Sequence, residues 1–494
     1  MQLADLIQPL EIISVSGPID REIAGISYDS RRVAPGNLFV AIKGGQFDGH
    51  SFVEQAIDKG AVAVVCEDAG LSQRATTIVT KNSRSALAKL AAVFYRHPSR
   101  RLKIIGVTGT NGKTTTTFLL KHLLQRAGQP TGLVGTVRYE IGERILPAQR
   151  TTPESLDLQE LLHQCAQSRC KNVVMEVSSI ALSQSRANEI AFDTAIFTNL
   201  TQDHLDFHAG MKDYFNAKAQ LFESLHRSGK RDHTAVINID DPYGQQLAAR
   251  FSKDIPIITY GMSARAEFRA SNFKVELSGT SYQLDAKERS YLVRLPLIGR
   301  FNIYNSLAAL AGAYSIGADI RGCVQALAKA PQVPGRLEVV PVKRQFQVFV
   351  DYAHTDDALL SVLKTCRDLN PNRLIVVFGC GGNRDRAKRP LMGRVVEEFA
   401  DYAIVTSDNP RKEDPEAIIR DIEKGFRNKN YEKNVDRKEA IDHAIRVAAP
   451  RDIILIAGKG HEKYQEFSDH TIPFDDVEVA ARALEAHPVE LNGS

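Results

Sequence analysis

The sequence predicts an α/β protein of three domains built around largely parallel sheets. Its 494 residues exceed what one hydrophobic core supports, and roughly three domains are the natural expectation. Continuous apolar runs alternate with helix-like segments, which is typical of parallel strands covered on both faces. A glycine-rich loop, GVTGTNGKTTTT (106–117), directly follows the apolar run 103–105. This arrangement is typical of a strand that turns into a helix.

The composition excludes several classes of protein. A net charge of +4 is slight for this length, and the Lys and Arg residues are scattered, so we expect no nucleic-acid binding. The six cysteines form no CxxC pair, and we expect reduced, mostly buried thiols. No apolar stretch reaches membrane-spanning length, and the first residues, MQLADLIQPLEI, lack a signal-peptide pattern. We therefore expect a cytoplasmic protein without membrane insertion.

The first two predicted domains cover residues 1–97 and 98–332. Strand-like runs at 38–42 and 61–66 belong to the first, and His97-Pro98-Ser99 is the predicted linker. In the second domain, buried parallel strands are predicted at 103–107, 172–177, 194–199 and 234–238. The stretch 265–298 indicates antiparallel strands, and 301–317 indicates a helix.

The third predicted domain, residues 333–494, repeats one plan: an apolar strand, a polar or glycine-containing loop and an amphipathic helix. The strand-to-loop junctions are FQVFVDYAH, RLIVVFGCGGNR, YAIVTSDNPR and DIILIAGKGHE. Ligands of open α/β sheets bind beyond the carboxyl ends of the strands. The polar residues of these junctions are therefore expected to line a ligand site.

The loop 106–117 predicts a nucleoside-triphosphate site. Its amides and the following helix N-terminus would face the phosphates, Lys113 would add a positive charge, and the Thr114 hydroxyl suits Mg²⁺. The spacing departs from the strict P-loop, because five residues rather than four separate Gly106 from Gly112. A structural Gly/Thr-rich turn is the alternative; otherwise the protein uses ATP or GTP.

Other candidate residues are ambiguous by themselves. Glu176 ends an apolar run and is suited to Mg²⁺, or is a surface glutamate at a strand end. His204 follows the run 194–199 and is a ligand or a structural histidine. Lys218 lies in an amphipathic helix, where a lysine is normally solvated. Arg411 follows Asn-Pro and either clamps a carboxylate or lies on the surface.

Together these motifs resemble those of the Mur ligases, ATP-dependent enzymes that form the peptide bonds of bacterial cell-wall precursors. The matching motifs are GTNGKTTT (109–116), MEVSS (175–179), TNLTQDHLDFH (198–208), YFNAKAQLF (214–222), GRFNIYNSLAAL (299–310), PGRLE (334–338) and DYAHT (351–355). The MurE branch of the family is the most similar. The motifs that indicate this branch are YDSRRVAPGNLFVAIKG (28–44), RTTPESLDLQ (150–159), GCGGNRDRAKRP (379–390), DNPR (408–411) and GKGHE (458–462).

The resemblance implies a UDP-binding N-terminal α/β domain, a central ATPase domain and a Rossmann-like C-terminal domain. It also implies the reaction. ATP phosphorylates the γ-carboxylate of D-Glu in UDP-MurNAc-L-Ala-D-Glu, and an amine of meso-diaminopimelate then displaces phosphate. Phosphate is a good leaving group, and positioning and charge neutralisation do most of the catalytic work. We expect a monomer whose partners are these small molecules.

By resemblance, the catalytic residues are Lys113, Glu176, His204 and Lys218. Thr114 and Glu176 would hold one Mg²⁺, and His204 and a carbamylated Lys218 a second, since carbamylation turns an ammonium into a carboxylate. The residues implied to bind ATP are Gly109, Thr110, Asn111, Gly112, Lys113, Thr114, Thr115, Asn305, Arg336 and Asp351. The residues implied to bind the UDP-sugar dipeptide are Ser30, Gln46, Thr151, Thr152, Ser178, Gln184 and Arg186.

The DNPR motif implies meso-diaminopimelate rather than lysine, because Asn409 and Arg411 could bind its second carboxylate. The residues implied to hold this amino acid are Arg384, Asp408, Asn409, Pro410, Arg411, Gly458 and Glu462. Unpaired buried donors would then discriminate against lysine. Ile180, Asp356 and Arg150 depart from the usual pattern, where the family commonly has His, Pro and Asn.

Other functions stay open from the sequence. One is another ligase of the superfamily, such as a lysine-adding MurE or a folylpolyglutamate synthase. The other is a nucleotide-dependent switch or an assembly ATPase, which would bind ATP without releasing phosphate in response to an amino acid.

Overall fold

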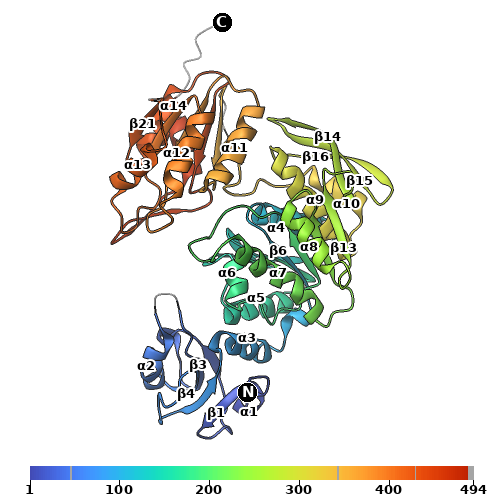
Figure 1. Cartoon of the computed structure of the whole chain (residues 1–494), viewed down its shortest axis with the longest axis vertical. Helices are drawn as coiled ribbons and strands as arrows, with labels where there is room; N and C mark the ends of the chain where they lie inside the picture. The colour runs from blue at the N-terminus through green and yellow to red at the C-terminus, as the bar shows by residue number, and fades with distance from the viewer. Residues whose placement is uncertain (45–46, 342–343, 429, 488–494) are drawn as a thin grey trace.

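The structure is a computed structural model that describes residues 1–44, 47–341, 344–428 and 430–487. Figure 1 shows the N-terminal domain at one end, the central domain in the middle and the C-terminal domain at the other end. Each is built around its own sheet, so the predicted α/β class with parallel-rich sheets is confirmed. No helix in the described part of the chain is long and apolar enough to cross a membrane.

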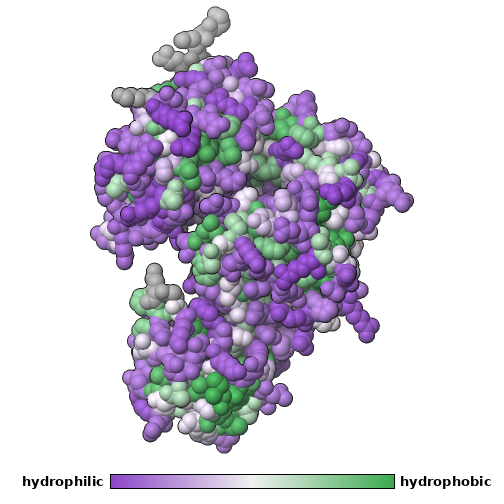
Figure 2. All heavy atoms as spheres, in the orientation of Figure 1, coloured by the Kyte–Doolittle hydropathy of each residue, from purple (hydrophilic) through white to green (hydrophobic). Residues whose placement is uncertain are grey.

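The N-terminal domain has a five-stranded sheet in the order β1-β5-β4-β3-β2. Its strands are β1 (Ile12–Ser16), β2 (Gly25–Ser27), β3 (Asn37–Val40), β4 (Ala61–Cys66) and β5 (Thr76–Thr80), and its helices α1 (Leu3–Ile7), α2 (Val53–Asp58) and α3 (Ser83–Phe94). β1 is an antiparallel edge strand, whereas the others pair in parallel. Figure 2 shows an apolar patch at this end of the molecule, and Ile12, Ile13 and Val15 of β1 are exposed there.

The predicted linker is a packed connection. Residues 98–100 form a short 3₁₀ turn in which Pro98 and Ser99 are buried, and the Ala191 amide donates to Ser99 Oγ over 3.1 Å. α3 packs against α5 (Ser155–Gln167) of the central domain, and Leu156 of α5 belongs to the N-terminal core. Buried apolar contacts therefore join the first two domains.

The central sheet has eleven strands in the order β16-β15-β14-β13-β12-β11-β6-β10-β7-β8-β9. The strands from β14 to β7 in this order pair in parallel, and both ends continue as antiparallel hairpins. The strands are β6 (Lys103–Thr108), β7 (Thr131–Val134), β8 (Arg138–Ile141), β9 (Arg144–Pro147), β10 (Asn172–Glu176), β11 (Thr194–Phe197), β12 (Thr234–Asn238), β13 (Ile257–Gly261), β14 (Phe268–Glu276), β15 (Gly279–Ala286) and β16 (Arg289–Leu295).

Helices cover both faces of this sheet. α4 (Lys113–Arg126), α9 (Arg300–Ser315) and α10 (Ile320–Leu327) bury one face, and α5, α6 (Ser179–Ser183), α7 (Met211–Arg227) and α8 (Pro242–Phe251) bury the other. The predicted buried strands, the antiparallel stretch and the helix near 301–317 are confirmed. The β8–β9 hairpin was not predicted from the sequence.

The C-terminal sheet has the order β17-β18-β22-β19-β20-β21, parallel except for β17. Its strands are β17 (Glu338–Val339), β18 (Gln347–Asp351), β19 (Leu374–Phe378), β20 (Tyr402–Thr406), β21 (Tyr431–Asn434) and β22 (Ile453–Ala457). α11 (Asp356–Asp368), α12 (Lys388–Phe399) and α13 (Pro415–Glu423) cover one face, and α14 (Arg437–Val447) and α15 (Asp476–Ala486) the other. A small hairpin of β23 (Tyr464–Glu466) and β24 (Thr471–Pro473) follows β22.

The strand orders explain where polar residues converge. β6 lies between β10 and β11, so the loop after β6, Glu176 at the end of β10 and the turn after β11 share one edge. In the C-terminal sheet, β22 lies between β18 and β19, which brings DYAH, GCGG and GKGH to one edge. All six cysteines are free and buried, as predicted.

A buried ion pair holds two strand ends of the C-terminal sheet. Arg437 Nε and Nη2 donate to Asp476 over 2.8 Å each, and both side chains are fully buried. The same guanidinium donates to the carbonyl of Ser407 (3.3 Å) and of Ala457 (3.0 Å). These carbonyls lie just before the DNPR and GKGHE segments, so the pair anchors both.

We expect Arg437→Met to lower the free energy of unfolding by about 3–5 kcal/mol, because it leaves Asp476 as an uncompensated buried charge. Urea denaturation measures the change. Arg482→Met, which removes an exposed partner of Glu478 on α15, is the control and should cost less than about 0.5 kcal/mol. Equal urea midpoints for the two variants would contradict the role of the pair.

Candidate active site

Two glycines shape the loop between β6 and α4. Gly109 has φ +149°, and a Cβ there would lie 1.8 Å from Thr198 Oγ1. Gly112 has φ +85°, and a Cβ there would lie 2.3 Å from Asn305 Oδ1. Any side chain would therefore collide with a polar group of the loop's surroundings. Gly112 is also the N-cap of α4 and brings no capping side chain, which leaves amides of the first turn available to an anion.

Lys113 folds back onto its own loop. Its ammonium donates to the carbonyls of Gly109 (2.9 Å) and Thr110 (2.8 Å), and burial lowers the pKa of this lysine. Thr115, the next helical residue but one, is buried in α4. The ammonium is thus held beside the loop by groups that a phosphate could replace.

Thr114 and Glu176 meet at the edge of the central sheet. Thr114 Oγ1 donates to Glu176 Oε2 over 3.0 Å, and Thr136 donates to the same carboxylate from its hydroxyl (2.9 Å) and its amide (2.8 Å). Arg336 Nη2 reaches Thr114 Oγ1 from the C-terminal domain over 3.1 Å. Hydroxyl and carboxylate oxygens are the ligands that Mg²⁺ prefers, so the pair fits this ion.

Other residues predicted to bind ATP surround the loop. Thr110 Oγ1 lies 3.1 Å from the Tyr214 hydroxyl, and Asn111 Nδ2 donates to Asp357 Oδ2 of α11 over 3.1 Å. Asp351 is buried at the end of β18, where its carboxylate accepts the amides of Leu337 and Ala353. The central and C-terminal domains therefore contact each other directly around the loop.

The structure buries Lys218, in contrast to the solvated lysine that its helix predicts. Only 1% of the residue is exposed, and its ammonium donates to the Gly109 carbonyl over 2.7 Å. It lies 4.4 Å from the centre of the Tyr214 ring. Burial, followed by repulsion from Lys113, holds the pKa of Lys218 well below its usual value. A neutral amine is the form that reacts with carbon dioxide.

His204 also contacts Tyr214. The two ring centres are 6.0 Å apart, and His204 Nε2 is 3.5 Å from Asp203 Oδ2. Burial lowers the pKa of His204, so the neutral imidazole that binds metals is favoured. The backbone of His204 has φ +54°, an uncommon value for a residue with a side chain.

No group of three or more His, Cys, Asp or Glu side chains in the described ranges is arranged to hold a metal ion. A Mg²⁺ here would need oxygens of other kinds, such as the Thr114 hydroxyl, a lysine carbamate or the phosphates of a nucleotide.

Most of the residues predicted to bind the UDP-sugar dipeptide lie together at the end of β10, near Glu176. Thr152 Oγ1 donates to the Glu176 carbonyl (2.9 Å) and accepts the Ser178 amide (3.1 Å), and Thr151 Oγ1 lies 3.1 Å from Thr136 Oγ1. Arg186 donates to the Thr152 carbonyl (3.2 Å) and to Gln184 Oε1 (2.5 Å).

One further residue of that set makes its hydrogen bond elsewhere. Ser30 is buried in the N-terminal domain, where its hydroxyl donates to Gln55 Oε1 over 2.8 Å. Gln46 lies outside the described residues. A charged cluster links the two domains nearby, since Glu154 forms ion pairs with Arg84 of the N-terminal domain (3.3 Å) and with Arg186 (3.0 Å).

The three departures from the family pattern have clear positions. Ile180 lies half-buried in α6, two residues after the N-cap Ser178. Arg150 donates to Glu154 over 3.1 Å, so it joins the charged cluster. Asp356 is the first residue of α11, as predicted, although the capping side chain is that of Thr355. A carboxylate in a first helical turn is favoured by the helix dipole.

The residues predicted to hold the amino acid come together from three loops of the C-terminal sheet. Asn409 is buried, and its Nδ2 donates to Glu462 Oε2 over 2.8 Å. Arg411 donates from Nε to Glu466 Oε2 and from Nη1 to the Gly382 carbonyl, both over 2.9 Å. Burial raises the pKa of Glu462. A carboxylate and a guanidinium therefore lie at the same edge of the sheet, suited to an ammonium and a carboxylate respectively.

The remaining predicted residues lie in the same loops. A Cβ at Gly458 would lie 2.6 Å from Asp408 Oδ2, and one at Gly382 would lie 1.9 Å from the Pro410 carbonyl, so these loops touch. Arg384 is exposed, and a Cβ at Gly381 would lie 3.0 Å from Arg411 Nη1 and 3.8 Å from Arg384 Cγ. Asp408 Oδ1 accepts the Asn409 amide over 2.6 Å.

Aromatic contacts connect the GKGHE loop to the glycine-rich loop after β6. The Arg336 guanidinium lies 4.7 Å from the centre of the Tyr352 ring, and the His461 ring of GKGHE lies 4.9 Å from it. Arg336 also donates to Thr114, so the side chains of His461, Tyr352 and Arg336 span the distance from the GKGHE loop to the glycine-rich loop (106–117), which we call the phosphate loop below.

Sequence reasoning missed several residues of the site. Thr136, Asp357 and Glu466 lie in segments without a motif, and only the folded chain brings them to Glu176, Asn111 and Arg411. Tyr214 is different, because it precedes Lys218 by four residues in one helix. That spacing places the two side chains on one face and could have pointed to their contact.

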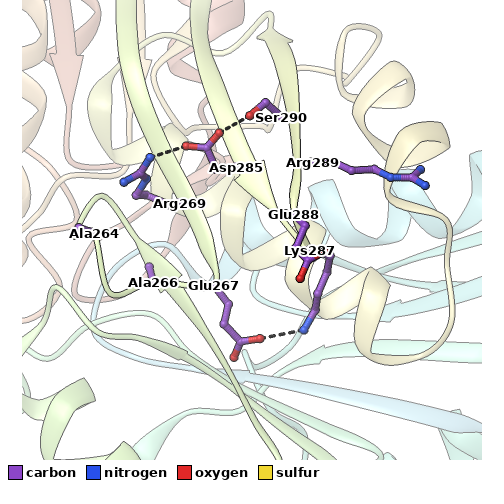
Figure 3. Close-up of a pocket in the computed structure, with 10 residues that line it drawn as sticks. Ala264, Ala266, Glu267, Arg269, Asp285, Lys287, Glu288, Arg289 and Ser290 are labelled. Atoms are coloured by element: carbon purple, nitrogen blue, oxygen red, sulfur yellow. Dashed lines mark hydrogen bonds and ion pairs between the residues drawn. The ribbon is translucent and has the colours of Figure 1, made fainter.

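A hollow of about 370 Å³ lies elsewhere, on the β14–β16 hairpins, and Figure 3 shows its lining. None of the residues predicted to form a site contributes to it. Four of its six charged groups pair with one another, Lys287 with Glu267 (2.8 Å) and Arg269 with Asp285 (2.6 Å). The hollow therefore offers few free groups to a ligand.

Comparison with known proteins identifies the family. The chain matches the Mur ligase middle domain over residues 107–313 and the Mur ligase, glutamate ligase domain over 335–460. Residues 22–96 match a further domain described as "Mur ligase family, catalytic domain". The chain belongs to the Mur ligase family.

Individual relatives extend over the whole chain. A UDP-N-acetylmuramoyl-L-alanyl-D-glutamate--2,6-diaminopimelate ligase of Syntrophomonas wolfei is 48% identical over 490 residues, covering 98% of this chain and 99% of that protein. A solved ligase of the same name has a TM-score of 0.70 at 35% identity, covering 98% and 99%. A MurF ligase of Thermotoga maritima, solved with ADP, shares the fold at 20% identity and a TM-score of 0.64, covering 94% and 98%.

Proposed function

We propose that this protein is an ATP-dependent ligase that joins meso-diaminopimelate to the D-Glu γ-carboxyl of UDP-MurNAc-L-Ala-D-Glu in peptidoglycan precursor synthesis. The observation that carries the proposal is the pairing of Glu462 with Asn409 beside Arg411, at the strand edge that faces the phosphate loop. The name of the Syntrophomonas relative, at 48% identity, supports the same activity.

In this mechanism the phosphate loop binds ATP. The amides of the first turn of α4 and the Lys113 ammonium neutralise the β- and γ-phosphates, with Lys113 leaving the carbonyls that it contacts. Asn305, Asp351 and Arg336 would contact the rest of the nucleotide. Mg²⁺, held by Thr114 and Glu176, would supply further charge neutralisation.

His204 and Lys218 would hold the second Mg²⁺ after carbamylation of Lys218. The Lys218 amine adds to carbon dioxide and loses a proton, which yields a carbamate with a negative charge. Three features support this modification: burial, the lowered pKa of the lysine, and the phosphate-loop carbonyl 2.7 Å away. Without this modification, the buried ammonium of Lys218 would repel the nearby ammonium of Lys113.

The chemistry follows in two steps. The γ-carboxylate of the bound dipeptide attacks the γ-phosphorus of ATP, and ADP leaves. The amine of the diamino acid then attacks the acyl phosphate carbon, and phosphate leaves. The protein's contribution is positioning, because the dipeptide site around Thr152 and Ser178 adjoins Glu176, and the amino-acid pocket contacts the same region through Arg336.

The pocket favours diaminopimelate over lysine. Arg411 still has donors beyond those that it gives to Glu466 and Gly382, and these would bind the second carboxylate that lysine lacks. Glu462 would bind the distal ammonium together with the Gly458 carbonyl, and Arg384 the carboxylate at the reacting centre. A monomer located in the cytoplasm remains our prediction.

Phosphate release decides between this function and the alternatives. With ATP, Mg²⁺ and UDP-MurNAc-L-Ala-D-Glu, we expect release with meso-diaminopimelate and at least about a hundredfold less with L-lysine, because buried donors would stay unpaired. Phosphate release with lysine but not with diaminopimelate would indicate a lysine-adding enzyme. Binding of ATP without release for either amino acid would favour the switch or assembly ATPase, or a folylpolyglutamate-synthase-like ligase with another acceptor.

We expect Lys218→Ala to lower the turnover number by about a hundredfold or more, because a charge-neutralising group near the phosphates is lost. Added formate or acetate should restore part of the activity by replacing the carbamate. Lys212→Ala, an exposed lysine in the same helix, is the control and should behave as wild type. Full activity of the untreated Lys218→Ala variant would return Lys218 to a structural role.

We expect Arg411→Ala to raise the KM for meso-diaminopimelate by about tenfold or more through loss of charged hydrogen bonds, and to leave the KM for ATP unchanged. Initial rates at varied concentrations of each substrate measure both constants. Lys412→Ala changes the exposed neighbouring residue and is the matched control. An unchanged KM for diaminopimelate would remove Arg411 from the pocket.

A further inference from the structure

Lys459, the second residue of GKGHE, has a fully buried side chain behind the amino-acid pocket. Its ammonium donates to Asn409 Oδ1 over 2.9 Å and lies 3.4 Å from Glu462 Oε2. The Tyr464 ring lies beside it, with 5.5 Å between the ammonium and the ring centre. A buried lysine thus contacts two of the residues that would bind the diamino acid, although no motif argument assigned it a role.

The contacts of Asn409 depend on this lysine. Asn409 Oδ1 accepts from Lys459 and from the Glu466 amide (3.0 Å), and Nδ2 donates to Glu462 (2.8 Å). An ammonium can only donate, and so can a backbone amide, so both require the oxygen of Asn409 on their side. The side-chain amide is therefore held in one orientation, with one N–H on Glu462 and the second N–H left for a ligand.

Lys459 also balances the charge of Glu462. The groups that face Glu462 are Lys459, Asp408, Asn409 and the rings of Tyr352 and Tyr464, with Arg437 farther away. Asp408 disfavours ionisation of Glu462, whereas Lys459 favours it. With Oε2 occupied by Asn409 and Lys459, Oε1 is the oxygen available to the ammonium of a bound amino acid.

We propose that Lys459 is a positioning and specificity-determining residue that orients Asn409 and Glu462 and makes the pocket selective for a diamino acid with a second carboxylate. This inference rests on the proposed function. A diaminopimelate end carries an ammonium and a carboxylate and adds no net charge. A lysine end adds one positive charge, which the buried ammonium of Lys459 disfavours.

The test compares Lys459→Met, which removes charge and donor, with Lys459→Gln, which keeps a donor without the charge. We expect Lys459→Met to raise the KM for meso-diaminopimelate by about tenfold or more, because the variant loses the charged hydrogen bonds that hold Asn409 and Glu462. The KM for ATP should not change. The ratio of kcat/KM for diaminopimelate to that for L-lysine should fall, and Lys459→Gln should lie between Lys459→Met and wild type.

Lys463→Met is the matched control, because this neighbouring lysine is exposed and pairs with Asp475 outside the pocket. The inference is overturned if Lys459→Met leaves the KM for diaminopimelate unchanged, or if it raises the KM for ATP by the same factor. In either case, diaminopimelate-dependent phosphate release by the wild-type protein would still support the proposed function. If Lys459→Met does not fold, the KM values of Lys459→Gln for diaminopimelate and for ATP decide instead. Absence of diaminopimelate-dependent phosphate release by wild type would overturn the proposed function, and this inference with it.

Discussion

The hydrogen bond from Arg336 to Thr114 joins the two sheets on which the proposed reaction depends. An acyl phosphate would form on the central domain, whereas the attacking amine would be bound by loops of the C-terminal domain. The guanidinium reaches Thr114 Oγ1 over 3.1 Å and covers the Tyr352 ring, against which His461 of the GKGHE loop packs. This side chain, together with the hydrogen bond from Asn111 to Asp357, therefore links the loop after β6 to the C-terminal domain.

Buried cations recur in the site, and each is compensated differently. Arg437 is paired with Asp476 and two carbonyls, so its charge is fully matched. Lys459 contacts one amide oxygen and one carboxylate. Lys218 has a carbonyl and an aromatic ring but no carboxylate among its described contacts. Because burial without a counter-ion disfavours an ammonium, Lys218 is the cation most suited to chemical modification.

Much of the fold could be predicted because its strands are long apolar runs. The strands that end near the site, such as β6, β10 and β22, are buried on both faces and leave a strong pattern. The β8–β9 hairpin leaves a weak one, since the β9 side chains are largely exposed. The packed connection at residues 97–100 was predicted as a linker because its burial comes from contact with Ala191, far along the chain.

The sequence by itself determined the glycine-rich loop, the succession of strands and loops along the chain, and the residue types at the strand ends, because local spacing encodes these features. Only the tertiary structure decided which of these groups meet. It buried Lys218 beside Gly109, placed Glu466 on Arg411 and set Lys459 behind Asn409. These contacts depend on the order of the strands within each sheet, which puts residues distant in sequence at one sheet edge. No local sequence pattern records that spatial order.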